Sequence, residues 1–177
     1  NCYGRISYDA VQLLISASVN SPIICEYLLN NIPFDKLLQD VENSKCICLL
    51  ISSIIRRDSS FANSFISLLD NLLQLYYESK LNDKIFIVEV ICLIILNVDA
   101  KLIGVVDPIY ELLLEGIYLD NDIIGIIIDT LHHMNYGGDD FRQVLLDQIS
   151  SDDVMAAIHA SDILNQIDQN FSNNDST

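Results

Sequence analysis

The sequence lacks tryptophan and contains few prolines, glycines, histidines and basic residues. Its 177 residues include three prolines, six glycines, three histidines and nine lysines and arginines. The Gly137-Gly138 pair stands without the lysine or the glycine spacing of a phosphate-binding loop. His132, His133 and His159 have no neighbouring pattern that supplies a nucleophile. We therefore expect a protein that is not an enzyme and that uses no metal and no cofactor.

Basic residues are scarcest in the second half of the chain. The formal net charge is −16, and residues 99–177 hold fifteen acids against only Lys101 and Arg142. Residues 1–98 hold ten acids and seven bases, a net charge of about −3. Because an acidic surface repels phosphate groups, nucleic acid and anionic membranes are excluded as favoured partners. A basic peptide or a basic protein surface is the expected partner.

The cysteines lack a metal-binding spacing, and no apolar run is long enough to span a membrane. The five cysteines form no CxxC pattern; they are Cys2, Cys25, Cys46, Cys48 and Cys92. Three lie in strongly apolar runs, which is typical of reduced cysteines in a protein core. The most apolar run, residues 85–98, has fourteen residues, whereas a membrane span needs about twenty. No secretory signal is visible, so we expect an intracellular protein, cytoplasmic or nuclear.

The most informative feature that is present is the apolar stretch DKIFIVEVICLIILN at residues 83–97, whose hydrophobic part is interrupted only by Glu89. Three other segments resemble it when all are aligned on their last residue: QLLISASVN, CLLISSIIR and IIDTLHHMN. The four segments end at Asn20, Arg56, Asn97 and Asn135, with separations of 36, 41 and 38 residues. Such separations are typical of helical repeat arrays.

With these segments the chain resembles the armadillo and HEAT-like helical repeat family over about residues 9–149. In armadillo repeats the third helix often ends in a leucine, one further residue and an asparagine that binds the backbone of an extended peptide. Asn20, Asn97 and Asn135 match that asparagine, and Arg56 departs from it. The tryptophans that accompany these asparagines in nuclear cargo adaptors are absent. The resemblance implies an all-α, short right-handed armadillo-like α-solenoid of three to four imperfect repeats.

The domain prediction has three parts: a poorly anchored N-terminal end at residues 1–8, a helical domain at 9–167 and a disordered polar tail at 168–177. One alternative fold remains open. It is a compact Bcl-2-like helical bundle, in which the apolar helix at 85–98 would be wrapped by amphipathic helices. That alternative explains one very hydrophobic helix, but it does not predict four segments in register.

Hydrophobic periodicity and turn residues place the helices along the chain. Asp83 is the expected N-cap of the central helix, and a kink is expected near Leu69. On the first helix, one apolar face is expected at Ala10, Leu13, Leu14 and Ala17. The predicted helices cover about residues 10–19, 23–30, 44–57, 61–78, 83–97, 109–118, 123–134, 141–148 and 154–167, with a short helix beginning near Ile32.

We expect a non-enzymatic scaffold or adaptor that binds a peptide segment or protein surface along a concave acidic face. A Bcl-2-like module that captures an amphipathic helix in an apolar groove is the alternative. Glu89 must reach solvent at the groove or find a basic partner, because a buried unpaired charge is costly, and we expect it to face the concave side. The asparagines are either groove residues or simple helix caps. The predicted contact residues are Asn20, Arg56, Glu89, Asn97, Asp129, His133 and Asn135.

Overall fold

The computed structural model describes residues 8–104, 106–152 and 154–174. Within these ranges every regular element is helical, which confirms the all-α prediction. The α-helices are α1 (Tyr8–Asn20), α2 (Pro22–Asn31), α3 (Phe34–Leu37), α4 (Ser44–Arg57), α5 (Leu69–Glu78), α6 (Leu81–Leu96), α7 (Val106–Gly116), α8 (Ile124–His133), α9 (Asp139–Ile149) and α10 (Val154–Asn174). The 3-10 helices are η1 (Val41–Asn43), η2 (Ser59–Leu68), η3 (Ala100–Leu102) and η4 (Asn121–Ile123).

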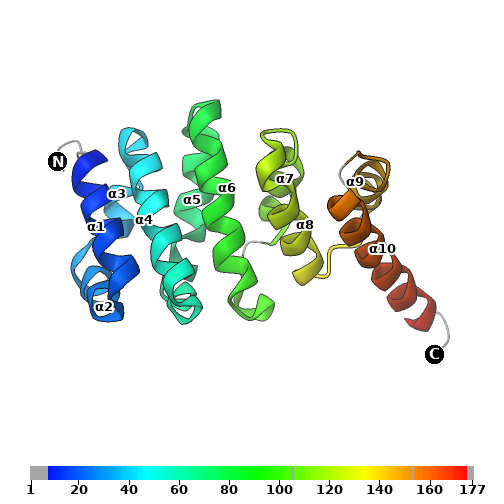
Figure 1. Ribbon diagram of the computed structural model, residues 1–177, viewed down its shortest axis with the longest axis horizontal. Coiled ribbons are helices and arrows are strands. Elements are labelled where there is room, and N and C mark those ends of the chain that lie inside the picture. The colour runs from blue at the N-terminus through cyan, green and yellow to red at the C-terminus, as the bar shows by residue number, and fades with distance from the viewer. Residues whose placement is uncertain (1–7, 105, 153, 175–177) are drawn as a thin grey trace.

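Five helices stand side by side along the long axis of the molecule: α1, α4, α6, α8 and α10 (Figure 1). We call these five helices the row. Successive members contact one another, from α1 on α4 and α4 on α6 to α6 on α8 and α8 on α10. They run in the same direction, so their C-terminal ends lie along one edge of the molecule (Figure 1). Helices α2, α3, α5, α7 and α9 form a second layer behind the row (Figure 1).

Helix α6 lies at the centre of the core. It packs against α4 and α8 in the row and against α5 and α7 in the second layer. Seven of its residues are buried, among them Ile87, Ile91 and Ile94 with no exposed surface. A helix that is apolar on almost every side needs neighbours on every side, and the two layers supply them.

The cysteines of the described residues are free thiols, and three are buried, as the sequence predicts for core cysteines: Cys25, Cys48 and Cys92. Burial raises the pKa of the Cys92 thiol to about 12, so this side chain packs as a neutral, weakly polar group. Cys46 is half-buried, and Cys2 lies outside the described residues. No helix within the described ranges combines the length and the apolar character required to cross a membrane.

Several predicted boundaries are confirmed and two details are wrong. Helix α4 has the predicted bounds, and the chain changes from 3-10 to α-helix at Leu69, where the kink is expected. The N-cap of α6 is Lys80 rather than Asp83, which lies in the first turn and there complements the helix dipole. On α1 the fully buried positions are Val11 and Ser18; Leu14 is half-buried against the core, whereas Leu13 is 73% exposed.

The C-terminal helix is longer than the sequence predicts. Helix α10 continues to Asn174, although a disordered tail is expected from Asp168 onward. The segment 168–174 contains neither proline nor glycine, and Arg142 of α9 forms an ion pair with Asp168 that holds its beginning. Residues 1–7 of the predicted N-terminal end and residues 175–177 of the predicted tail lie outside the described residues.

Candidate functional site

The ends of the four repeated segments lie at equivalent places in the row. Asn20 is the last residue of α1, Arg56 lies one residue before the end of α4, and Asn97 caps α6. Asn135 follows the end of α8 and adopts the left-handed conformation, with φ of 55°. Because the row helices are parallel, these residues are distributed along the edge where the row helices end (Figure 1).

The asparagine side chains are engaged with their own helices. Asn20 Nδ2 donates to the carbonyl oxygen of Ser16 at 2.6 Å, and Asn97 Nδ2 donates to that of Leu93 at 2.8 Å. In both cases the acceptor lies four residues earlier, so the amide satisfies a carbonyl in the last turn. Asn135 occupies a conformation that asparagine tolerates better than most residues. The three asparagines therefore serve to terminate and cap their helices in this structure.

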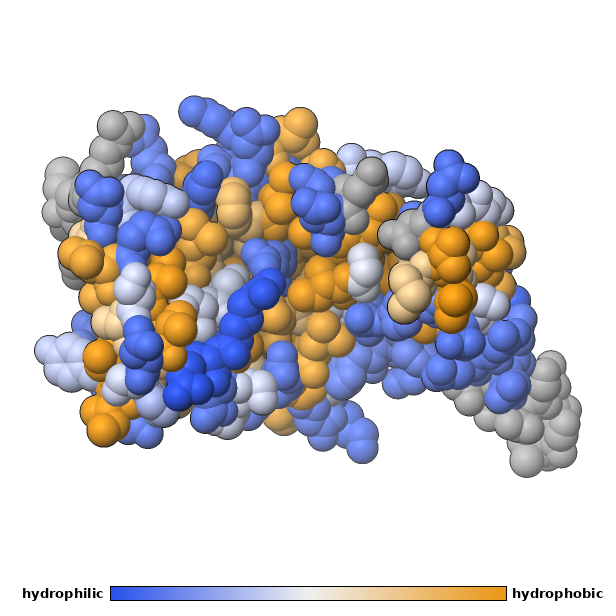
Figure 2. All heavy atoms as spheres, in the orientation of Figure 1, coloured by the Kyte–Doolittle hydropathy of each residue, from blue (hydrophilic) through white to orange (hydrophobic). Residues whose placement is uncertain are grey.

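Arg56 and Glu89 are brought together at an open hollow of about 650 Å³ between α1, α4 and α6. The two side chains form an ion pair, so Glu89 has the basic partner that its place on an apolar helix requires. Figure 2 shows strongly hydrophilic side chains that extend from the C-terminal end of α4 toward α6. We call this the arginine hollow; its lining residues are Gln12, Ile15, Val19, Leu49, Ser52, Ser53, Arg56, Arg57 and Glu89.

Asp129 and His133 lie on α8 and do not line the arginine hollow. Asp129 Oδ1 is 2.6 Å from His159 Nε2 on α10. His133 Nε2 is 3.2 Å from the carbonyl oxygen of Val98, which follows α6. These contacts connect α8 to its two neighbours in the row. The structure thus joins Arg56 with Glu89, and it gives Asp129 and His133 bridging roles between helices.

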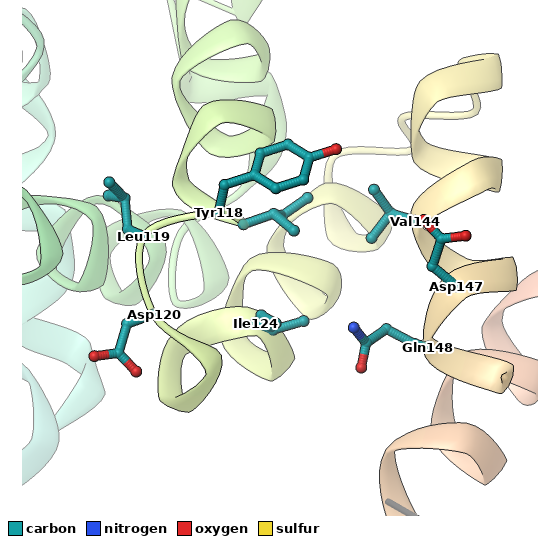
Figure 3. Close-up of a pocket in the computed structure, with 8 residues that line it drawn as sticks. Tyr118, Leu119, Asp120, Ile124, Val144, Asp147 and Gln148 are labelled. Carbon is teal, nitrogen blue, oxygen red and sulfur yellow. The ribbon is translucent and has the colours of Figure 1, made fainter. Parts of the chain in front are cut away.

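A second open region lies between α7 and α9. Two adjoining cavities of about 460 and 480 Å³ share Tyr118, Val144 and Asp147 in their walls. The tyrosine ring points across the gap toward Val144 of α9, and Gln148 points back toward Ile124 (Figure 3). We call this region the acidic groove; its lining residues are Glu111, Leu114, Glu115, Ile117, Tyr118, Leu119, Asp120, Ile124, Asp140, Gln143, Val144, Asp147 and Gln148.

The walls of the acidic groove are two helical stripes that face each other. Along α7 and the turn after it, Glu111, Leu114, Glu115 and Tyr118 follow the spacing of one helix face. Along α9 the same spacing places Asp140, Gln143, Val144 and Asp147 on one side. Each stripe therefore combines two carboxylates with an apolar side chain.

The groove carries negative charge without a lining lysine or arginine. Glu111, Glu115, Asp140 and Asp147 line the cavity of about 480 Å³, whereas Asp120 points away from α9 (Figure 3). Glu115 accepts a hydrogen bond of 3.2 Å from the Tyr76 hydroxyl. Burial and this carboxylate raise the pKa of Tyr76, so the phenol stays protonated and keeps donating.

Tyr118 is the groove residue that sequence reasoning missed most clearly. Its side chain is 85% exposed, although tyrosine rings usually cover apolar surface. The sequence contains a signal, since Glu111 and Glu115 are one helical turn apart and repel each other slightly. It gives no sign that α9 would present a matching stripe across the gap.

The described residues contain no group of three or more histidine, cysteine or acidic side chains placed to hold a metal ion. No protein-family model, curated protein or solved structure matches the chain.

Proposed function

We propose that the chain is a non-enzymatic interaction module built as a short, right-handed armadillo-like solenoid of three to four imperfect repeats. Two observations support the solenoid over a compact Bcl-2-like bundle. Helices α1, α4, α6 and α8 make their main contacts with neighbours in the row, whereas α10 packs chiefly against α9, and the second layer repeats beside the row. The four repeated segments also lie in α1, α4, α6 and the α8 region in the same orientation (Figure 1). Stacked units of this kind leave long surfaces for a partner.

The partner is a basic segment of another protein, and the acidic groove is where it binds. The main support for this site is the pair of facing stripes. They place four carboxylates around one cavity that has no lysine or arginine in its lining. Like charges that face one another destabilise the free module slightly. A lysine or arginine that enters the groove would relieve this repulsion and form charge-assisted hydrogen bonds.

The groove also suits the aliphatic part of a basic side chain. Tyr118 on one wall faces Val144 on the other, and Leu114 lies beside them. Lysine and arginine bury their methylene groups against apolar surface while their charged ends stay among polar groups. A cation over an exposed tyrosine ring adds about 0.5–1 kcal/mol. The groove therefore favours arginine or lysine over other polar residues.

Charge also decides between this partner and other occupants. A second copy of the chain would bring a further formal charge of −16, so self-association through this groove is disfavoured. An amphipathic helix without basic residues would leave the lining carboxylates without counterions. We therefore propose an intracellular basic partner, bound by a scaffold or adaptor, and we retain the amphipathic-helix module as the alternative.

A peptide selection tests this proposal. A displayed library of random dodecapeptides is selected on the full chain, and the peptides bound are expected to be rich in arginine and lysine. Neutralising four groove carboxylates should weaken their binding at least about tenfold, since charge-assisted hydrogen bonds are worth roughly 1.5–3 kcal/mol each. The neutralised variant carries Glu111→Gln, Glu115→Gln, Asp140→Asn and Asp147→Asn.

The control removes the same charge elsewhere. Four exposed acids of the first half are neutralised together, and this variant should bind the selected peptides as the unmodified chain does. The control substitutions are Asp9→Asn, Glu26→Gln, Asp35→Asn and Asp70→Asn. Rising salt should weaken binding to the unmodified chain, because exposed charges are screened. Equal binding by the groove variant, or selected peptides without basic residues, would contradict the proposal.

A further inference from the structure

The arginine hollow carries the opposite chemistry from the acidic groove. Arg56 and Arg57 both line it, and Glu89 is its only lining carboxylate. Because Arg56 forms an ion pair with Glu89, one positive charge in the lining is left over. The hollow lies between α1, α4 and α6, in the N-terminal half of the chain. This half, residues 1–98, has a net charge of only about −3.

The lining cation that forms no ion pair with the described residues is Arg57, and it is exposed. The adjacent Asp58 turns its carboxylate to its own helix start, where Oδ1 accepts a hydrogen bond of 2.9 Å from the Ser60 amide. An arginine guanidinium offers a fork of donors that matches a carboxylate. Asp58 interacts with Arg57 only through its charge and not through an ion pair, so the guanidinium donors of Arg57 can bind an acid that enters the hollow.

Ser52 supplies a second, independent observation. Its side chain lines the hollow and only 5% of the residue is exposed, yet Oγ has no hydrogen-bond partner among the described residues. The neighbouring hydroxyls are committed, since Ser18 Oγ donates to the Ile15 carbonyl and lies 3.2 Å from Ser53 Oγ. Buried hydroxyls are nearly always hydrogen-bonded. Ser44 and Ser79 also have buried hydroxyls without a partner in the described part of the chain, but of the three only Ser52 lines the hollow, where an entering acceptor would satisfy it.

The shape of the hollow fits an extended segment of protein chain. On α4 the residues Leu49, Ser52, Ser53 and Arg56 share one helix face, and on α1 a parallel stripe includes Ile15 and Val19. Apolar side chains thus form the sides, while donors are concentrated at the C-terminal end of α4. A bound peptide would place an acidic side chain beside the donors at the end of α4. The peptide residues next to that acid would pack against Ile15, Val19 and Leu49.

We propose that the arginine hollow is a second binding site, which takes an aspartate or glutamate side chain of a partner protein. Arg57 provides the charge, Ser52 donates a hydrogen bond, and Arg56 remains with Glu89. The site is separate from the acidic groove and does not depend on it. A partner with acidic and basic segments could use both sites, whereas each site alone selects its own charge.

The test uses random dodecapeptides selected on the full chain and counter-selected on an Arg57→Glu variant. Peptides that survive should be rich in aspartate and glutamate, and Arg57→Glu should weaken their binding at least about tenfold. Lys80→Glu is the matched control, because it makes the same charge change at an exposed lysine outside the hollow and should leave binding unchanged. Circular dichroism of both variants should match the unmodified chain, since Arg57 is exposed.

Ser52→Ala distinguishes a ligand role from a structural role. Removing an unbonded buried hydroxyl should keep or raise the thermal midpoint of the free chain, while it weakens binding of the acidic peptides about threefold or more. A lowered midpoint with unchanged binding would overturn the role of Ser52. Failure to recover peptides that distinguish the unmodified chain from Arg57→Glu would overturn the site. The groove variant with four neutralised carboxylates should bind these peptides at least as well, so the two proposals can fail separately.

Discussion

Replacing Phe141 by alanine is expected to destabilise the α9–α10 hairpin by about 3–5 kcal/mol. Phe141 is completely buried at the start of α9. Its ring belongs to an aromatic cluster in which Tyr136 lies 6.1 Å from Phe141 and 4.3 Å from Tyr110 of α7, measured between ring centroids. The alanine side chain would leave a cavity where α9 is anchored to the preceding unit.

The part of the chain that loses stability in this variant distinguishes a solenoid from a bundle. In a solenoid each unit depends chiefly on its neighbours, so native-state hydrogen exchange should show reduced protection in α9 and α10 and nearly unchanged protection in α1, α2 and α4. Leu146→Ala is the matched control on α9, because Leu146 is 47% exposed. Equal loss of protection in every helix would contradict the solenoid proposal and favour a single cooperative bundle.

The second large effect is expected at the centre of the chain. Ile91→Ala should lower the free energy of unfolding by about 2–5 kcal/mol, because Ile91 has no exposed surface and α6 is packed from both layers. This loss should reach the neighbouring units on both sides, unlike the loss at Phe141. Chemical denaturation of the two variants measures both effects.

Leu81→Ala provides the control for Ile91 within the same helix. Leu81 is 66% exposed at the first position of α6, and a substitution of this kind changes stability by roughly 0.5 kcal/mol or less. A loss at Ile91 no larger than that at Leu81 would mean that α6 is not the central core helix. Both variants replace a large aliphatic residue of α6 by alanine, so they differ mainly in how deeply the replaced side chain is buried.

The sequence predicts the helices of this protein better than it predicts their contacts. The all-α class, the bounds of α4 and the change at Leu69 follow from periodicity and turn residues, which act locally. The face of α1 is mispredicted because its sequence is apolar on more than one side. The packing of α4 and α2 against α1 determines that Val11 and Ser18 are buried and Leu13 is not.

The candidate sites show the same difference: the sequence predicts local features of each site but not the contacts between helices. The pairing of Glu89 with a base follows from one charged residue on an apolar helix, but its partner Arg56 lies 33 residues away and is identified only in the structure. The asparagines recur in register, yet Asn20 and Asn97 bond to their own helices. Tyr118 lies in the turn after α7 and Asp147 lies on α9, and nothing local to either stripe indicates that they face each other.

The most direct measurement is a titration of the isotopically labelled chain with hexa-arginine, followed by amide chemical shifts. We expect the shifts to be concentrated at the residues lining the acidic groove, especially Tyr118, Val144 and Asp147, and to be lost in the variant with four neutralised carboxylates. The arginine hollow should be unaffected, because like charges repel there. Shifts spread evenly over all acidic helices, or centred on Arg56 and Glu89, would contradict a specific site for a basic segment between α7 and α9.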